Sequence, residues 1–375
     1  MAVTTSLDDA RDRLERARAA TRVAGVDALL VSPSADLFYL TGYEAVPLER
    51  LTCLVLPAEG DPRLVAPGLE RAAALASPVG ALGIEVVAWA ETDDPYALTA
   101  SLLPAGARTV AVDNHMAAEQ VLALREAMPA ARQTLAGTVL RELRMRKTPV
   151  EVTALREAGA AIDAVHARMG EWLRPGRSER EVGRDIADAI LSAGHVRADF
   201  VIVGSGPNGA SPHHGVSDRV VRPGDPVVVD IGGTMPSGYR SDSTRTYVAA
   251  GPVPDDVLTY YPVLLDAQAQ QCGYARPGVS AESVDAVGRE AIAAAGYGAA
   301  FVHRTGHGIG LETHEEPYIV AGNALVLAEG MAFSIEPGIY LEGRSGARIE
   351  DIVVCTADGV ERLNTTSREL VVLPG

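Results

Sequence analysis

The sequence predicts a mixed protein of two domains: a smaller α/β domain, then a larger α+β domain that contains an internal duplication. Three observations support this prediction. Apolar, β-prone runs alternate with helical patterns up to residue 135, a strong helix-start signal follows at Thr148, and one helical segment further along occurs twice. The length of 375 residues agrees with two domains, because single hydrophobic cores rarely grow beyond about 250–300 residues.

The N-terminal domain is expected over residues 1–135. A charged, alanine-rich stretch over 7–24 predicts a helix that ends at Gly25. Later segments alternate between β-prone runs, at 27–32, 52–57, 84–90 and 108–113, and helical patterns, at 68–76, 95–103 and 116–128. This alternation is typical of an α/β domain.

A linker over residues 136–148 and a second domain over 149–375 are expected next. The boundary rests on a helix-start signal: Thr148 can cap the helix, Pro149 suits its first position, and Glu151 can complete a capping box.

The second domain contains a faint repeat. "RPGRSEREVGRDIADAILSAG" begins at Arg174, and "RPGVSAESVDAVGREAIAAAG" begins 102 residues later at Arg276. Each copy predicts one amphipathic helix with a serine N-cap and a glycine terminator. A duplicated domain would bring corresponding segments of the two copies together around a pseudo-twofold axis.

Two acids follow each copy in corresponding positions. "RPGDPVVVDIG" and "AEGMAFSIEPG" both run from an apolar strand to an acid and then a glycine, so Asp230 corresponds to Glu336. The next strand of each half begins with an acid, Asp242 in "RSDSTRTYV" and Glu350 in "ARIEDIVV". We therefore expect two β-hairpins, each with two carboxylates at facing strand ends.

Four acids next to an apolar core cannot all remain ionised without cations. Protonation, arginine side chains or divalent metal ions could each neutralise them, and ordinary acids at strand ends remain the alternative. Arg245 and Arg348 supply only part of the charge, and lysine is absent after residue 147, so metal is the better account. Strand alternation places Arg348 and Glu350 on one face and Asp351 on the other.

Oxygen ligands with a single imidazole suit Mn²⁺, Co²⁺, Fe²⁺ or Zn²⁺, and several shared carboxylates favour two ions. The stretch "HRTGHGIGLETHEEP" offers His303, His307 and His314. Its glycines disfavour a helix, and four residues of extended chain span about 13 Å, so His303 and His307 are not expected to share one ion.

The composition excludes several classes of partner. A net charge of −16 argues against nucleic acid and anionic membranes, and no apolar run is long enough to span a bilayer. Three scattered cysteines, Cys53, Cys272 and Cys355, fit a reducing compartment. The charged N-terminus shows no signal peptide, so a cytoplasmic location is expected.

The motifs "VVVDIGG", "SDSTRT", "GHGIGLETHE", "SIEPGIY" and "RIEDIVV" resemble those of metallopeptidases with the pita-bread fold. Within this family, the Xaa-Pro aminopeptidases and Xaa-Pro dipeptidases (prolidases) are the most similar branches. The resemblance extends over residues 150–375. Residues 1–135 look like the creatinase-type N-terminal domain, with "SADLFYLTGY" as the distinctive stretch.

The resemblance implies a dinuclear metal site with five ligands: Asp230, Asp242, His307, Glu336 and Glu350. Asp230 and Asp242 would hold one ion, His307 would complete the other, and the two glutamates would span or share them. A metal-bridged water or hydroxide would attack the scissile carbonyl, and Glu336 would carry its proton.

The same resemblance implies roles for further residues. His213 would contact substrate near the leaving group, His314 would stabilise the tetrahedral intermediate, and His303 would line the substrate pocket. Arg348 would orient the carboxylates. The neighbouring His214 has no family role and is expected to be solvated or to cap a turn.

The expected function is therefore hydrolysis of the Xaa-Pro bond in dipeptides or short peptides by a homodimeric enzyme. Two divalent ions, Mn²⁺ or Co²⁺ with Zn²⁺ or Fe²⁺ as alternatives, would serve it. The rival functions are another small-molecule reaction on the same fold, such as ectoine-type amide hydrolysis or a sulfonium lyase, and a non-enzymatic binding module.

Overall fold

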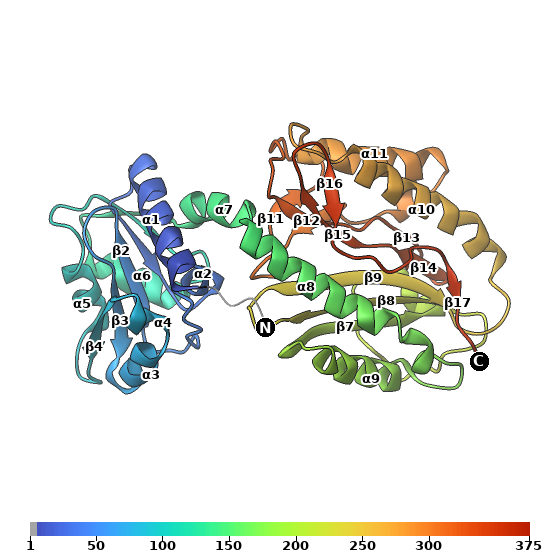
Figure 1. Ribbon diagram of the computed structural model, residues 1–375, viewed down its shortest axis with the longest axis horizontal. Coiled ribbons are helices and arrows are strands. Elements are labelled where there is room, and N and C mark those ends of the chain that lie inside the picture. Colours follow the sequence, from blue (N-terminus) through green and yellow to red (C-terminus); the bar gives the residue numbers. More distant parts are fainter. Residues whose placement is uncertain (1–5) are drawn as a thin grey trace. The chain divides into compact units, whose positions relative to one another are not determined.

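The computed structural model describes residues 6–375, and the chain divides into two compact units (Figure 1). The first ends at Arg144 and the second spans Met145–Gly375. The segment 136–148, for which the sequence predicts a helical linker, contains the helix α7 (Gly137–Met145).

The N-terminal unit is a six-stranded mixed sheet with helices on it. The strand order is β4-β3-β2-β1-β5-β6, in which β1 pairs antiparallel with β2 and parallel with β5. The strands are β1 (Ala28–Val31), β2 (Cys53–Pro57), β3 (Arg63–Pro67), β4 (Glu85–Trp89), β5 (Thr109–Val112) and β6 (Arg132–Leu135). The helices before α7 are α1 (Leu7–Val23), α2 (Ala35–Thr41), α3 (Arg71–Ala76), α4 (Pro78–Ala81), α5 (Pro95–Ser101) and α6 (Ala118–Ala127).

The four predicted strands and the helices expected near them are confirmed. The strands β3 and β6 are not predicted by the sequence pattern. The edge strand β6, "RQTL", is polar and partly exposed, so it carries no apolar signal. The other, β3, lies between two strands that the pattern did predict, and its apolar residues Leu64 and Val65 are fully buried. In β3, "RLVAP", Arg63 and Pro67 leave an apolar run of only three residues, and proline disfavours a strand assignment.

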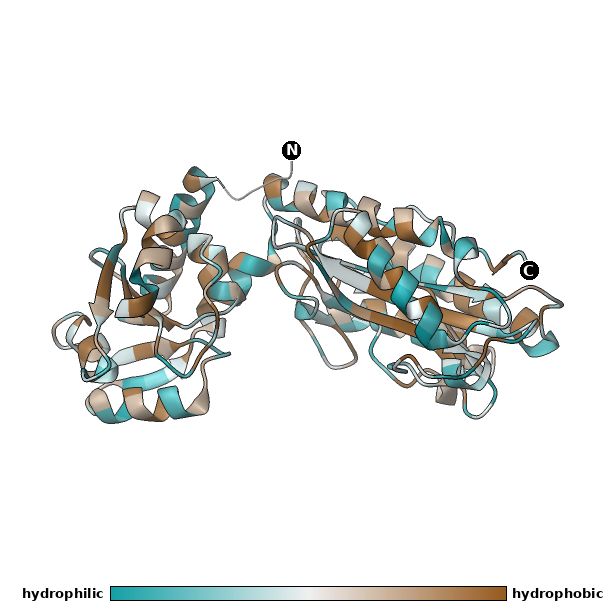
Figure 2. Cartoon of the chain, turned by 90° about the horizontal axis from the view of Figure 1, so that it is seen from below, coloured by the Kyte–Doolittle hydropathy of each residue, from teal (hydrophilic) through white to brown (hydrophobic). Residues whose placement is uncertain are grey.

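The C-terminal unit surrounds its strands with four long helices: α8 (Pro149–His166), α9 (Glu179–Ser192), α10 (Asp255–Tyr274) and α11 (Ala281–Ala294). Hydrophobic and hydrophilic residues are interspersed along these helices (Figure 2). On α9 the buried residues Val182, Ile186 and Ile190 recur at helical spacing and pack with Val203 of the neighbouring sheet. Amphipathic helices over sheets are the α+β arrangement that the sequence predicts.

The strands of this unit form three sheets. A four-stranded sheet has the order β17-β9-β8-β7, with β7 (Arg197–Ser205), β8 (Pro226–Thr234), β9 (Arg240–Val248) and β17 (Val371–Val372). A five-stranded sheet has the order β11-β10-β12-β15-β16, with β10 (Gly306–Gly308), β11 (Glu315–Ile319), β12 (Ala332–Ile335), β15 (Asp351–Cys355) and β16 (Val360–Arg362). The third is the hairpin of β13 (Gly338–Leu341) and β14 (Ser345–Arg348).

The two halves repeat the same backbone interactions, which agrees with the predicted duplication. Before α9, Gly176 has a φ of 90° and donates its N–H to Val221 O; before α11, Gly278 has a φ of 91° and donates to Leu327 O. Both glycines occupy a left-handed conformation that other residues rarely adopt.

One detail of the repeat differs from the prediction. Ser178 caps α9 and forms a capping box with Glu181, whereas the side chain of Ser280 makes no capping hydrogen bond to α11. The residue corresponding to Glu181 is Ser283, whose hydroxyl donates to the carbonyl of Ser280 instead. A serine at that position cannot reach back as a glutamate does.

The expected position of the acids at strand ends is wrong for the first half. Asp230 and Asp242 lie within the nine-residue strands β8 and β9, which continue past them as one hairpin. In the second half β12 pairs with β15, and β13 and β14 are inserted between them. Glu336 therefore follows β12, and Glu350 precedes β15.

Lys147 is the only lysine of the chain, and it forms an ion pair with Glu315 at the start of β11. The side chains are 1% and 7% exposed, so two opposite charges lie together inside the protein. The pair rests on Gly310, where a Cβ would lie 2.6 Å from Glu315 Oε1 and 3.0 Å from Lys147 Nζ. Gly310 thus makes room for the pair.

We expect Lys147→Met to lower the free energy of unfolding by about 3–5 kcal/mol, because it removes one charge of a buried pair. Urea or thermal unfolding measures the loss, and Lys147→Met/Glu315→Met should recover most of it. The control is Arg344→Met, whose ion pair with Asp256 is exposed and worth at most about 1 kcal/mol. Equal losses in the two single variants would contradict the assignment of a stabilising buried pair.

Candidate metal centre

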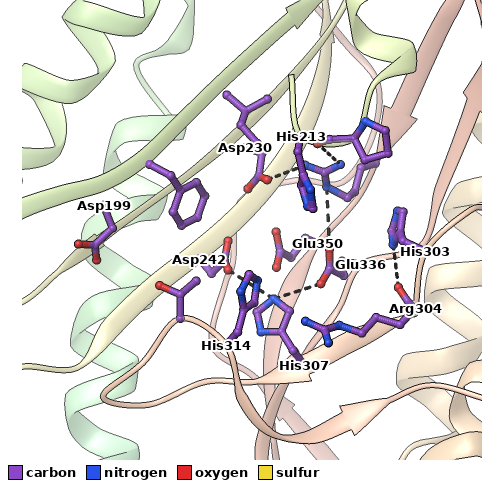
Figure 3. Close-up of a pocket in the computed structure, with 15 residues that line it drawn as sticks. Asp199, His213, Asp230, Asp242, His303, Arg304, His307, His314, Glu336 and Glu350 are labelled. Atoms are coloured by element: carbon purple, nitrogen blue, oxygen red, sulfur yellow. Dashed lines mark hydrogen bonds and ion pairs between the residues drawn. The ribbon is translucent and has the colours of Figure 1, made fainter. Parts of the chain in front are cut away.

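The C-terminal unit contains a cavity of about 650 Å³ that is lined by all nine residues singled out from the sequence (Figure 3). They are His213, Asp230, Asp242, His303, His307, His314, Glu336, Arg348 and Glu350. The volume is in the range of small-ligand sites. Residues more than 130 positions apart in the sequence thus meet in one place.

Two sheets supply the acidic side chains. Register places Asp230 opposite Thr244 and Asp242 opposite Gly232, so the two aspartates project from adjacent strands to the same face of the sheet. Glu336 and Glu350 come from the ends of β12 and β15, which pair with each other. The side chains of Asp230, Asp242 and Glu350 are at most 12% exposed.

His307 faces these acids from the short strand β10. Its Nδ1 contacts the carbonyl of Gly308 at 3.1 Å, and its Nε2 lies 3.2 Å from Glu336 Oε1 and 3.7 Å from Asp242 Oδ2. With the proton on Nδ1, the Nε2 lone pair points at the carboxylates, as in a metal-ligating histidine.

Potential ligand atoms of Asp242, His307 and Glu350 all lie within 4.8 Å of one another. This group contains both Asp242 and His307, whereas the family resemblance assigned these residues to different ions. Asp230 and Glu336 add further oxygen atoms at the edge of the same group (Figure 3).

The pKa values of the four acids show that other side chains of the protein neutralise only part of their charge. Burial, together with the neighbouring carboxylates, raises the pKa of Asp242 and of Glu350 well above the usual values, and burial also raises the pKa of Asp230. Burial opposes ionisation of Glu336 as well, but its hydrogen bond with His307 and the charges nearby lower its pKa to about 2.

Two buried carboxylate oxygens support a metal in this position. Within residues 6–375, neither Asp230 Oδ1 nor Glu350 Oε1 has a hydrogen-bond partner. Orphaned, buried carboxylate oxygens are unfavourable unless a cation is present. Hard oxygen donors and one imidazole therefore fit divalent transition-metal ions.

Arg348 is the buried cation among these acids. It bonds to Asp230 Oδ2 at 2.5 Å, to the Tyr340 hydroxyl at 2.7 Å and to Thr244 Oγ1 at 3.1 Å. Asp351, which strand alternation places on the opposite face from Arg348 and Glu350, points away from the cavity as predicted. It accepts a hydrogen bond from Arg245. Arg245 thus neutralises Asp351 and not the acids of the cavity.

Three histidines surround the acids. His213 and His314 lie on opposite sides of them in Figure 3, and the His314 ring packs edge-on against His307 with a centroid distance of 4.1 Å. Partial desolvation and the nearby His307 lower the pKa of His314 to about 4. His303 is held by the Tyr340 hydroxyl at 2.9 Å, and burial lowers its pKa.

The expectation that His214 is solvated or caps a turn is wrong. Its Nε2 bonds to Glu179 Oε2 at 2.8 Å, and the carboxylate of Glu179 is fully buried. Glu179 also accepts hydrogen bonds from Ser205, Asn208 and Ser217, so it holds both ends of the loop that carries His213.

Neither Glu179 nor the apolar residues of the cavity lining are predicted by the sequence pattern. Glu179 was seen only as a residue of the repeated helix, because its bonding partners lie 26–38 residues away. Phe200 and Ile202 form an apolar wall, and a β-bulge between Ala198 and Phe200 also turns Asp199 toward the cavity. A bulge breaks the alternation from which strand faces are predicted.

Models of known families match both parts of the chain. Residues 153–357 match metallopeptidase family M24, and residues 13–146 match the creatinase/prolidase N-terminal domain. The chain belongs to metallopeptidase family M24, and its fold is the pita-bread fold with a creatinase-type N-terminal domain that the sequence predicts.

The relatives within this family are peptidases. The chain is 55% identical over 362 residues to the probable dipeptidase PepE of Mycobacterium tuberculosis. The match covers 96% of this chain and 96% of that one. It is 39% identical to the Xaa-Pro dipeptidase of Lactobacillus delbrueckii subsp. lactis, over 93% of this chain and 96% of that one.

Solved structures give the same result. The crystal structure of dipeptidase PepE from Mycobacterium ulcerans has a TM-score of 0.95 at 53% identity and covers 99% of this chain and 100% of that one. The recombinant prolidase from Thermococcus sibiricus has a TM-score of 0.90 at 37% identity, over 97% and 99% of the two chains.

Across residues 6–375, none of the helices has the length and apolarity needed to cross a membrane.

We expect Asp242→Asn and Glu350→Gln each to weaken binding of Mn²⁺ or Co²⁺ about tenfold or more, because each removes a charged donor from the group around His307. Elemental analysis after dialysis and calorimetric titration measure the loss. The matched control is Asp199→Asn, which alters a cavity acid paired with Arg197 and Arg240. Unchanged metal content in both test variants would refute the ligand assignment.

Proposed function

We propose that the protein is a metal-dependent dipeptidase that hydrolyses the Xaa-Pro bond. The observation that carries the proposal is the grouping of Asp242, His307 and Glu350, with Asp230 and Glu336 beside them, in a cavity lined by three further histidines. The names of the relatives, a probable dipeptidase and an Xaa-Pro dipeptidase, supply the substrate class.

We propose five metal ligands: Asp230, Asp242, His307, Glu336 and Glu350. Two divalent ions, Mn²⁺ or Co²⁺ with Zn²⁺ or Fe²⁺ as alternatives, suit this donor set. Bound there, they would acidify a water molecule and stabilise developing negative charge on the scissile carbonyl.

The remaining chemistry belongs to the side chains. Glu336 Oε1 is engaged by Ser334 at 2.9 Å and by His307, so Oε2 is the oxygen available to take a proton from the attacking water. His213 has no hydrogen-bond partner among the described residues, and its ring is free to donate to the substrate near the leaving nitrogen. His314, on the other side, would stabilise the tetrahedral intermediate.

The cavity suits a short peptide with a bulky apolar residue. Phe200, Ile202 and Pro212 are the apolar residues of its lining, and His303 lines it as well. A tertiary Xaa-Pro amide has no N–H, so its recognition depends on shape and on contacts to its carbonyl and proline ring.

Assembly and location are also part of the proposal. We propose a cytoplasmic homodimer with domains over 1–135 and 149–375 joined by 136–148. The three cysteines are all free, which supports a reducing compartment. Light scattering, which measures the molar mass in solution, tests the dimer. The mass of a monomer at assay concentration would contradict it.

We expect the Mn²⁺- or Co²⁺-loaded protein to release proline from Xaa-Pro dipeptides, and chelation to abolish the release. Xaa-Pro-Yaa tripeptides, followed by chromatography in parallel, separate a dipeptidase from an aminopeptidase. Xaa-Ala dipeptides serve as the specificity control. Cleavage of neither proline substrate with metal bound would overturn the assignment and favour ectoine-type amide hydrolysis or a sulfonium lyase.

We expect Glu179→Gln to lower kcat/KM about 10- to 100-fold with metal content unchanged, because a loosened loop misplaces His213. The matched control is Glu181→Gln on the same helix, an exposed capping residue. The decisive measurement is a double-mutant cycle: Glu179→Gln should add little to the loss caused by His213→Ala. Fully additive losses would show that Glu179 acts on stability and not through His213.

A further inference from the structure

A second cavity of about 580 Å³ lies in the C-terminal unit outside the metal centre. A loop near the C-terminus lines most of it, with Arg362, Thr365, Thr366, Ser367, Arg368 and Glu369. No residue of the metal centre lines this cavity. Glu369 is the only acid in its lining, although the chain as a whole carries a net charge of −16.

Three arginines gather around one carboxylate beside this cavity, and a second carboxylate, that of Asp163, is bonded to Thr365 and Thr366 of the lining. The buried carboxylate of Asp351 has three guanidinium groups around it: Arg245 at 2.7 Å, Arg368 at 3.9 Å and Arg362 at 4.0 Å. Arg245 takes the closest position, and Gln268 occupies the other carboxylate oxygen at 3.0 Å. Arg368 also donates to Gln268 Oε1 at 2.7 Å, so Arg362 and the remaining N–H groups of Arg368 are the guanidinium donors left for a ligand.

The backbone of the loop adds two donors to the cavity lining. Arg245 binds the carbonyls of Thr366 at 2.8 Å and Ser367 at 3.0 Å. In a trans peptide the N–H points opposite to the preceding carbonyl, so the N–H groups of Ser367 and Arg368 point away from Arg245. Within residues 6–375 neither N–H has a hydrogen-bond acceptor, and both residues line the cavity.

We propose that this cavity binds a phosphate group, held by Arg362 and Arg368 and by the N–H groups of Ser367 and Arg368. Two guanidinium groups and two parallel amides match the several acceptor oxygens of a tetrahedral dianion. The free hydroxyl of Thr366 lies in the same lining. The ligand is free inorganic phosphate or the phosphate of a small monoester.

The test is calorimetric titration of the full-length, metal-loaded protein with inorganic phosphate in a chloride buffer of low ionic strength. Arg362→Gln and Arg368→Gln should each weaken binding about tenfold, because each removes a charge-assisted hydrogen bond. The matched control is Arg344→Gln, an arginine paired with Asp256 in the same unit, which should bind as the unchanged protein does.

Phosphate can also meet the metal ions, so a second measurement locates the site. Amide NMR signals of Ser367 and Arg368 should shift with the same saturation curve as the calorimetry, and this readout does not depend on the stability of the arginine variants. Titration with glycerol 3-phosphate compares the two sources: tighter binding than inorganic phosphate indicates a monoester, and weaker or equal binding indicates the free ion. Unchanged affinity in Arg362→Gln, together with unshifted signals of Ser367 and Arg368, would overturn the proposal. These readouts are independent of peptidase activity.

Discussion

The structure of the C-terminal unit depends on one electrostatic constraint: four carboxylates converge in a protein interior that supplies a single buried arginine to offset them. Asp230, Asp242, Glu336 and Glu350 all face one cavity. Of these four acids, Arg348 hydrogen-bonds only to Asp230, and its Nε lies 4.0 Å from Glu336 Oε2. The pKa values of both aspartates and of Glu350 are raised because burial and like charges disfavour ionisation. Such a cluster is stable as carboxylates only with added cations, which relates the fold directly to metal binding.

Duplication explains how one chain assembles that cluster. The first half contributes two aspartates from a long hairpin, and the second half contributes two glutamates and His307 from an interrupted one. The inserted strands β13 and β14 also contribute to the site, because Tyr340 on β13 bonds to both His303 and Arg348. The two halves have thus diverged into different parts of one site while they keep the same backbone scaffold.

Residues behind the cavity hold the reactive side chains in place. Ser334 donates to Glu336 and accepts from the backbone of His307, so one hydroxyl positions two of the donors. Glu179 does the same for the loop of His213 through His214, Ser205 and Ser217. These partners are buried and polar, and in such networks the loss of one member leaves others unsatisfied. The geometry of the site is therefore a property of the whole unit.

The sequence by itself determined the duplication, most of the helices and the strands that carry the four acids, through apolar periodicity, helix caps, turn glycines and acids beside apolar strands. The resemblance of its motifs to those of a known family added His213, His303 and His314, which also line the cavity. Only the tertiary structure decided that β8 and β9 continue past their aspartates, that Asp199 turns inward at a bulge, and that His214 binds Glu179. Each of these depends on a partner strand or on a residue far away in the chain. Local sequence carries no information about the atoms that such a side chain will meet after folding.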